Sequence, residues 1–170
     1  MNLKITLFKE KVHASLVPEL TEMLHLAYKP LAERGFRYSA THQPPETTLK
    51  RLKYFESYLA HWDGQLVGTI ALMKWNPDSP CEYYRKEGVY HFGQFAVKPG
   101  FQGRGIANQL LWVIEERVRK LSGKELALDT AEGAGELIEM YRRHGFKAVS
   151  TTKWASTNYQ SIIMTKELKS

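Results

Sequence analysis

A glycine-rich turn is the clearest candidate for ligand binding in this chain. Its residues run Gln102-Gly103-Arg104-Gly105-Ile106-Ala107. Apolar residues then recur at helical spacing as far as Leu121, so the turn is expected to begin a helix. The first N–H groups of a helix lack intrahelical partners and carry a partial positive charge. Because glycines let an anion approach the backbone closely, the pattern predicts a phosphate or pyrophosphate site.

Two familiar phosphate-binding turns fit this stretch less well. A nucleoside-triphosphate loop needs Lys followed by Ser or Thr after its glycines, and no such pair follows here. A dinucleotide-binding turn needs a third glycine where this chain has Asn108, and it follows the first strand of a βαβ unit. Here the turn follows a fourth predicted strand, after a meander. The sequence therefore disfavours both classes.

A polar and aromatic segment at 34–45 is the second candidate region. Gly35 lies near one end of the segment and two prolines close the other, which predicts a loop. Loops carry recognition residues more often than they carry the core. The candidates for a substrate pocket are Arg37, Tyr38, Thr41 and Gln43. The alternative is a linker with a satisfied turn.

Length and composition limit the class of protein. The 170 residues suit a single domain spanning 1–170, and the formal net charge of +6 is spread over several small basic groups. We expect groups such as Lys50/Arg51/Lys53 to form solvated faces, although a field that attracts polyanions is the alternative. Cys81 is the only cysteine and lies in a turn-rich loop, so neither a disulfide nor a metal site is expected. No apolar run reaches membrane-spanning length, which predicts a soluble, cytoplasmic protein.

The spacing of apolar residues predicts the strands and helices that position these residues. Strands are expected at 3–7, 54–62, 66–73, 91–97, 126–130, 146–154 and 159–168, and helices at 13–28, 46–52, 106–121 and 136–144. Pro30 should end or kink the first helix. Asp63-Gly64 predicts a hairpin. This order combines a meander with one strand–helix–strand crossover, so the expected fold is α/β (α+β), a mixed sheet with helices on both faces.

Two spaced motifs resemble the GCN5-related N-acetyltransferase (GNAT) superfamily. One is the Phe95-Ala96-Val97 strand with Pro99 and the turn Gln102–Ala107; the other is Tyr141-Arg142-Arg143-His144-Gly145-Phe146. The resemblance covers about Leu66 to Leu168. It implies a mainly antiparallel sheet that is split between the strands ending near Val97 and Thr130.

The resemblance also implies a co-substrate, acetyl-CoA, bound without a metal. Backbone groups of Phe95 and Val97, on the Phe95-Ala96-Val97 strand, would pair with the pantetheine arm. The N–H groups of Gln102 to Ala107 would hold the pyrophosphate, in agreement with the argument from the helix N-terminus. Arg104 would add positive charge there or would be an exposed turn residue.

The chemistry implied is acetyl transfer to a primary amine by direct attack. Tyr141 matches the tyrosine that protonates the CoA thiolate, a task suited to a neutral phenol. His91 is a candidate base, with ordered water as the alternative and Gln94 as a residue that positions the water. Many members of the family carry an Asn seven residues before the tyrosine; here that position is Ala134.

The acceptor cannot be read from these motifs. A small-molecule or peptide amine is expected, without a membrane and without nucleic acid, and a homodimer stays open. The alternative function is a non-catalytic basic module, for nucleic acid or acyl-CoA sensing, on the same scaffold. Such a module would bind nucleic acid with a steep dependence on salt.

Overall fold

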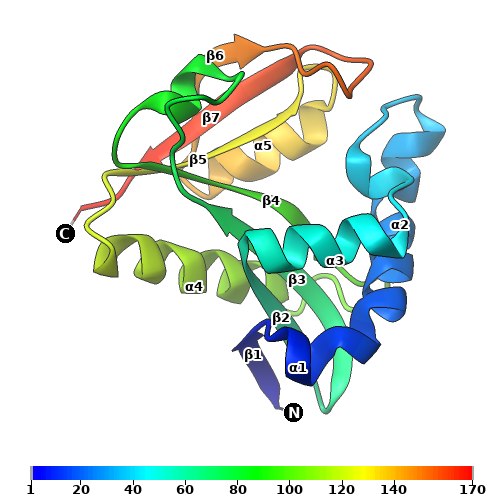
Figure 1. The fold of residues 1–170 in the computed structure, drawn as a ribbon. Helices are drawn as coiled ribbons and strands as arrows, with labels where there is room; N and C mark the ends of the chain where they lie inside the picture. Colours follow the sequence, from blue (N-terminus) through cyan, green and yellow to red (C-terminus); the bar gives the residue numbers. More distant parts are fainter. Residues whose placement is uncertain (1, 170) are drawn as a thin grey trace. The chain divides into compact units, whose positions relative to one another are not determined.

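The computed structural model describes residues 2–169 and contains the predicted alternation of strands and helices (Figure 1). In chain order the elements are β1 (Leu3–Leu7), α1 (Glu10–His13), η1 (Ala14–Leu16), α2 (Val17–Glu33), η2 (Ser39–Thr41), α3 (Pro45–Tyr54), β2 (Glu56–Trp62), β3 (Gln65–Met73), η3 (Glu82–Arg85), β4 (Val89–Val97), α4 (Ile106–Lys120), β5 (Glu125–Ala131), α5 (Gly135–Arg143), β6 (Lys147–Thr152) and β7 (Ser161–Glu167), where η denotes a 3-10 helix.

The strands form a mixed seven-stranded sheet in the order β1-β2-β3-β4-β5-β7-β6. The pairs β1–β2, β2–β3, β5–β7 and β6–β7 are antiparallel, whereas β4–β5 is parallel. The fold class is therefore the predicted mixed, mainly antiparallel sheet flanked by helices. The chain divides into two compact units, the described residues of Met1–Leu72 with Gln94–Val113, and those of Met73–Gly93 with Ile114–Ser170.

The first unit is built on the β2–β3 hairpin and the helices before it. Asp63 and Gly64 both have positive φ, 47° and 86°, as the predicted hairpin turn requires. Apolar residues of α2 pack with residues of β2, β3 and β4 in one cluster: Phe8, Val17, Leu20, Met23, Leu24, Ala40, Leu52, Leu59, Leu66 and Ala96. A Cβ at Gly68 would lie 3.1 Å from the Ala96 carbonyl oxygen and 3.1 Å from Leu110, so glycine lets β3, β4 and α4 approach closely.

The second unit is built on β5, which pairs with β4 on one side and β7 on the other. The parallel ladder from β4 to β5 runs from Val89↔Glu125 to His91↔Ala127. A small buried cluster covers β5 and β7: Cys81, Tyr84, Val89, Ala127 and Ile163, with Tyr83 and Trp154 at its margin. The loop that carries Cys81 is thus part of the core of this unit.

Several expected boundaries were wrong, among them the following three. Pro30 does not end the long helix, because α2 continues through it to Glu33. Tyr54 belongs to α3 and not to β2, since the Phe55 N–H still donates to the Arg51 carbonyl at 2.9 Å and closes a last helical turn. Strand β4 begins at Val89, two residues before His91.

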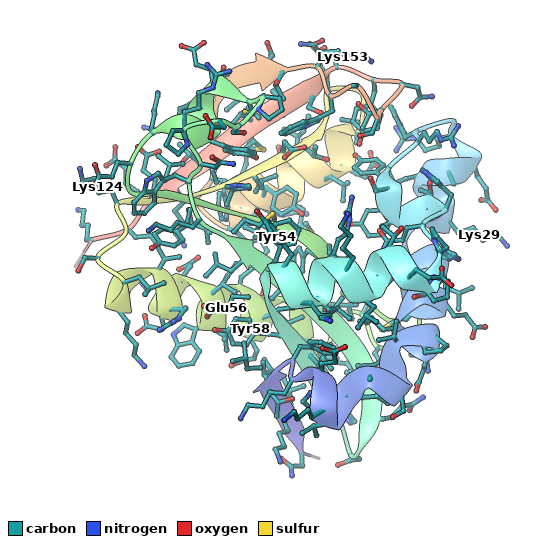
Figure 2. All side chains as sticks on the ribbon, in the orientation of Figure 1. Lys29, Tyr54, Glu56, Tyr58, Lys124 and Lys153 are labelled. Carbon is teal, nitrogen blue, oxygen red and sulfur yellow. The ribbon has the colours of Figure 1, made fainter. Side chains whose placement is uncertain are left out.

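Surface charge is dispersed over both units. Lys29, Lys124 and Lys153 are exposed and are among the side chains labelled in Figure 2. Across residues 2–169, no helix is both long enough and apolar enough to cross a membrane.

Candidate functional site

The glycine-rich turn has the backbone conformation that the phosphate prediction requires. Gly103 and Gly105 have φ of 75° and 79°, in the left-handed region that glycine tolerates best. An added Cβ at either position would have no heavy atom within 4 Å, so the turn faces open space. Helix α4 begins directly afterwards at Ile106, which is buried and anchors the first turn. An anion can therefore approach the first N–H groups of α4 without hindrance.

Arg104 is held in this turn by two aromatic rings. Its guanidinium carbon lies 4.7 Å from the ring centre of Phe101 and 5.6 Å from that of Trp62. Cation–π contacts of this kind restrict a long side chain while leaving its N–H donors available. Arg104 is thus an exposed turn residue, as one of the two expectations had it, and its positive charge lies against two aromatic rings.

Strand β4 has an irregular backbone at Gln94, whose φ of 46° is unusual for a non-glycine residue. Gln94 is 8% exposed, and its Oε1 accepts a hydrogen bond of 3.2 Å from Nε2 of Gln43, which is 2% exposed. The same Nε2 donates to Thr48 Oγ1 at 2.8 Å, and Thr21 Oγ1 donates to that hydroxyl at 2.8 Å. Two predicted substrate residues, Gln43 and Gln94, therefore meet in a buried polar network that fixes the irregular point of β4.

The side chains of β4 after Gln94 are more exposed than the alternation of apolar and polar residues predicts. Phe95 and Val97 are partly exposed, whereas Ala96 is buried. The Phe95 carbonyl accepts a hydrogen bond of 2.9 Å from the Tyr28 hydroxyl. One lone pair of this carbonyl is therefore already used within the protein.

The 34–45 segment is more ordered than a simple linker. Thr41 Oγ1 donates to the Tyr38 carbonyl at 2.6 Å within η2. The Tyr38 ring lies 5.5 Å from that of Tyr28, centre to centre. Tyr38 and Thr41 therefore contact each other. Arg37, the remaining predicted residue of this segment besides Gln43, is exposed.

Tyr141 lies in the second unit, near the end of α5. It is 8% exposed and packs edge-to-face with Phe92 and Phe146, with ring centres 6.0 Å apart in both pairs. Its carbonyl accepts from the Phe146 N–H at 3.1 Å, which closes α5 around Gly145, whose φ is 92°. Ala134 is fully buried at the start of α5, where its carbonyl accepts the first helical bonds. It supplies no side-chain amide in place of the expected Asn.

His91, also in the second unit, is stacked face to face on Tyr84. The ring centres are 3.8 Å apart and the planes differ by 6°. Burial lowers the pKa of His91 from 6.5 to about 4, and a hydrogen bond with the Lys74 backbone opposes this shift. The imidazole is therefore neutral at pH 7, so it can accept a proton, but it is a weaker base than an exposed histidine.

Asp129 was missed by the reading of the sequence. Its Oδ1 accepts from the Tyr84 hydroxyl at 2.8 Å, and its Oδ2 accepts from Trp154 Nε1 at 2.9 Å. Burial raises the pKa of the Asp129 carboxyl, and these two hydrogen bonds oppose the rise. The signal was present, because an aspartate within an apolar strand is rarely buried without partners.

Arg51 on α3 was also missed, since it stands between two lysines that suggested a solvated face. It is partly buried, in contrast to the exposed Lys50 and Lys53. Burial lowers the pKa of the Arg51 guanidinium, and electrostatic interaction with Tyr28 opposes this. Arginine nevertheless stays charged at every physiological pH.

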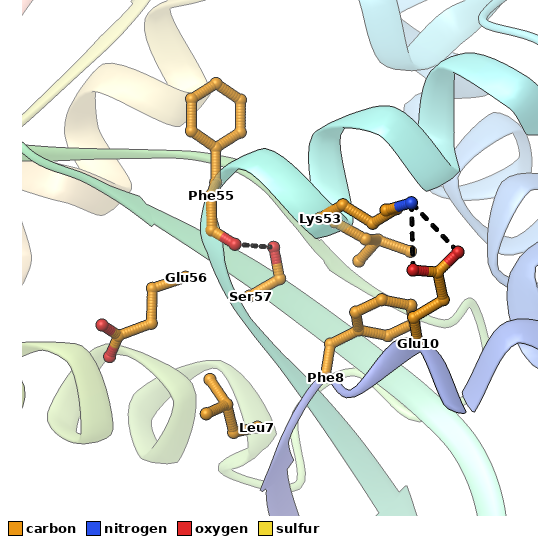
Figure 3. A pocket seen from close by; sticks show the side chains of 8 residues that line it. Leu7, Phe8, Glu10, Lys53, Phe55, Glu56 and Ser57 are labelled. Carbon is orange, nitrogen blue, oxygen red and sulfur yellow. Dashed lines mark hydrogen bonds and ion pairs between the residues drawn. The ribbon is translucent and has the colours of Figure 1, made fainter. Parts of the chain in front are cut away.

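A separate groove of about 320 Å³ lies in the first unit (Figure 3). Its lining comprises Leu7, Phe8, Glu10, Leu52, Lys53, Phe55, Glu56 and Ser57. Lys53 and Glu10 form an ion pair of 3.0 Å across it, so its cation is already neutralised. None of the predicted site residues lines this groove.

The chain is similar to one protein family and to two characterised relatives. The profile of the acetyltransferase (GNAT) family matches residues 19–146. S-(2-succino)cysteine N-acetyltransferase of Bacillus subtilis (strain 168) is 34% identical over 131 residues, which cover 75% of this chain and 76% of that protein. S-alkylcysteine N-acetyltransferase of the same organism is 25% identical over 133 residues, which cover 76% of this chain and 72% of that protein.

A solved structure supports the fold over nearly the whole chain. PaiA N-acetyltransferase from Thermoplasma acidophilum, in complex with coenzyme A, has a TM-score of 0.72 at 18% identity. The alignment covers 98% of this chain and 99% of that one. At this identity the likeness concerns the fold.

Proposed function

The chain belongs to the acetyltransferase (GNAT) family and is an N-acetyltransferase, and we propose that it transfers an acetyl group from acetyl-CoA to the α-amine of an S-substituted cysteine. The observation that carries this proposal is the 34% identity to an enzyme named for such an acceptor. The second relative, named for S-alkylcysteine, supports the same class of acceptor.

The co-substrate supplies an acetyl thioester, and the glycine-rich turn has the features needed to hold its pyrophosphate. Gly103 and Gly105, which precede the first N–H groups of α4, have left-handed φ values, and an added Cβ at either would meet no heavy atom within 4 Å. Arg104, fixed by Phe101 and Trp62, adds a positive charge beside them. The backbone of Phe95 and Val97 would bind the pantetheine arm, with the Phe95 carbonyl shared with Tyr28.

The proposed reaction is a direct attack. The neutral amine nitrogen forms a bond to the thioester carbonyl carbon, and the carbon–sulfur bond breaks. Tyr141 donates its phenolic proton to the leaving thiolate. The attacking nitrogen loses a proton to His91 or to a water molecule, which Gln94 would help to position. A backbone N–H of β4, at Phe95 or Val97, would stabilise the negative charge on the carbonyl oxygen.

A panel of amines tests the proposed acceptor. Release of CoA is measured with S-methylcysteine, S-(2-succino)cysteine, a polyamine, an aminoglycoside and a peptide with a free N-terminus. The proposal expects the highest kcat/KM for the S-substituted cysteines. Preferential acetylation of the polyamine, the aminoglycoside or the peptide would overturn it.

Binding of the co-substrate is tested separately. Acetyl-CoA in large excess over its Kd should raise the melting temperature, because a ligand that binds only the folded state stabilises it. No shift with millimolar acetyl-CoA would contradict the assignment of the glycine-rich turn.

A further inference from the structure

Arg51 carries a positive charge that the protein itself does not neutralise. Within residues 2–169, its guanidinium forms no ion pair and no hydrogen bond, although it is partly buried. Other cations have carboxylate partners. Lys53, two residues later on α3, pairs with Glu10, and Arg119 pairs with Glu115 and Glu116. Buried charges are normally paired, so a partly buried guanidinium without a protein partner is a candidate for binding an anion.

The neighbours of Arg51 connect it with the irregular point of β4. Thr48, three residues earlier, lies on the same side of α3 and is hydrogen-bonded to Gln43, which in turn bonds to Gln94. Tyr28 interacts electrostatically with Arg51, and its hydroxyl donates to the Phe95 carbonyl at 2.9 Å. Arg51 is therefore one helical turn from a member of the network that holds Gln94, and all these residues belong to the first unit.

This position matches a chemical need of the proposed acceptor. An S-substituted cysteine carries an α-carboxylate on the same carbon as the attacking amine. A guanidinium binds a carboxylate with two parallel hydrogen bonds, which fixes its orientation as well as its place. A carboxylate fixed beside Phe95 would hold the amine next to the strand that is expected to bind the thioester.

We propose that Arg51 binds the α-carboxylate of the amino-acid acceptor and thereby makes the enzyme selective for amino acids over simple amines. This inference rests on the proposed function, because it concerns the same acceptor. It assigns selectivity to α3, whereas the sequence suggested the 34–45 loop.

The test compares two acceptors in three enzymes. S-methylcysteine and its decarboxylated analogue, S-methylcysteamine, differ only in the carboxylate. Steady-state kinetics are measured for the wild type, for Arg51→Gln and for Lys50→Gln, which removes an exposed charge from the same helix. Melting temperature and acetyl-CoA affinity are measured for each protein, to separate folding and co-substrate binding from acceptor binding.

The wild type should prefer S-methylcysteine, and Arg51→Gln should raise its KM about 10- to 100-fold, as expected for the loss of a charge-assisted hydrogen bond. The kinetics with S-methylcysteamine should stay unchanged, and Lys50→Gln should behave like the wild type. Arg51→Lys should recover part of the loss, because the charge remains but the paired geometry does not.

Three results would overturn the inference, and each has a different meaning. A wild type that shows no preference for S-methylcysteine would contradict the proposed acceptor as well. A wild-type preference that Arg51→Gln retains would contradict only the role of Arg51. Equal losses with both acceptors would assign Arg51 a structural role instead.

Discussion

At the scale of single residues, burial decides what the ionisable groups can do. His91, Tyr84 and Asp129 form a stacked and hydrogen-bonded set in which burial lowers the pKa of His91 and raises the pKa values of Tyr84 and Asp129. Arg51 cannot become neutral in this way, and the partner proposed for its charge is the carboxylate of the acceptor. The proposed roles in proton transfer and specificity therefore go to His91 and Arg51, two residues whose charge is affected by burial in the fold.

Replacement of Tyr141 by phenylalanine tests the proposed acid. The substitution retains the edge-to-face packing with Phe92 and Phe146 and removes only the proton donor. We expect kcat to fall by about 10²- to 10⁴-fold, the usual contribution of a general acid. The Kd of acetyl-CoA, measured by calorimetry, should change little. Unaltered turnover would remove Tyr141 from this role.

The depressed pKa of His91 makes stability depend on pH. Its pKa is about 4 in the folded protein and near 6.5 when exposed, so between these values the unfolded chain binds more protons. The free energy of unfolding should therefore decrease as pH falls from 6.5 towards 4, by roughly 3 kcal/mol at most. His91→Gln should lack this component, as seen by urea denaturation at several pH values. Asp129 is present in both the wild type and His91→Gln, so its titration does not distinguish them. If the free energy of unfolding changed with pH in the same way in both proteins, the expectation would be contradicted.

At the scale of elements, the junction between β4 and α4 carries the proposed co-substrate site. Gln94, within strand β4, has a positive φ in the left-handed region. The turn that follows the strand contains two glycines, Gly103 and Gly105, with φ in the same region. Helix α4 then presents its N-terminus. Helices α2 and α3 contribute Tyr28 and Thr48 to the hydrogen bonds around this strand.

Replacement of Gly105 by alanine tests the role of the turn. Gly64, in the β2–β3 hairpin, is a matched control, because both glycines have φ near 80° and open space around an added Cβ. Each substitution should lower the free energy of unfolding by about 1–2 kcal/mol through backbone strain. Only Gly105→Ala should also weaken acetyl-CoA binding. Equal affinities for acetyl-CoA in the two variants would argue against a pyrophosphate site at this turn.

At the scale of the whole molecule, we propose that residues 1–170 act as one domain. Strand β4 and helix α4 each contribute residues to both compact units, so neither unit has a separate set of elements. Denaturation followed by far-UV circular dichroism and by tryptophan fluorescence should give coincident single transitions. Two separated transitions would indicate units that unfold independently.

Local patterns made much of this fold predictable. The glycine-rich turn, the Asp63-Gly64 hairpin and the strand periods depend on neighbouring residues, and the structure has the elements they predict. Arg51 and Asp129 could not be assigned in the same way. Whether Arg51 faces solvent depends on how α3 packs near Tyr28, and the partners of Asp129, Tyr84 and Trp154, are distant in sequence. Tertiary contacts decided these sites.

The most direct test of the account is to identify the product. The protein is mixed with acetyl-CoA and S-methylcysteine, and the amino acid is analysed by NMR while released CoA is quantified. The account predicts an acetyl group on the α-nitrogen, with one CoA released for each product molecule and a much slower reaction in Tyr141→Phe. Intact amino acid after prolonged incubation, or release of CoA as acetate accumulates instead, would contradict it.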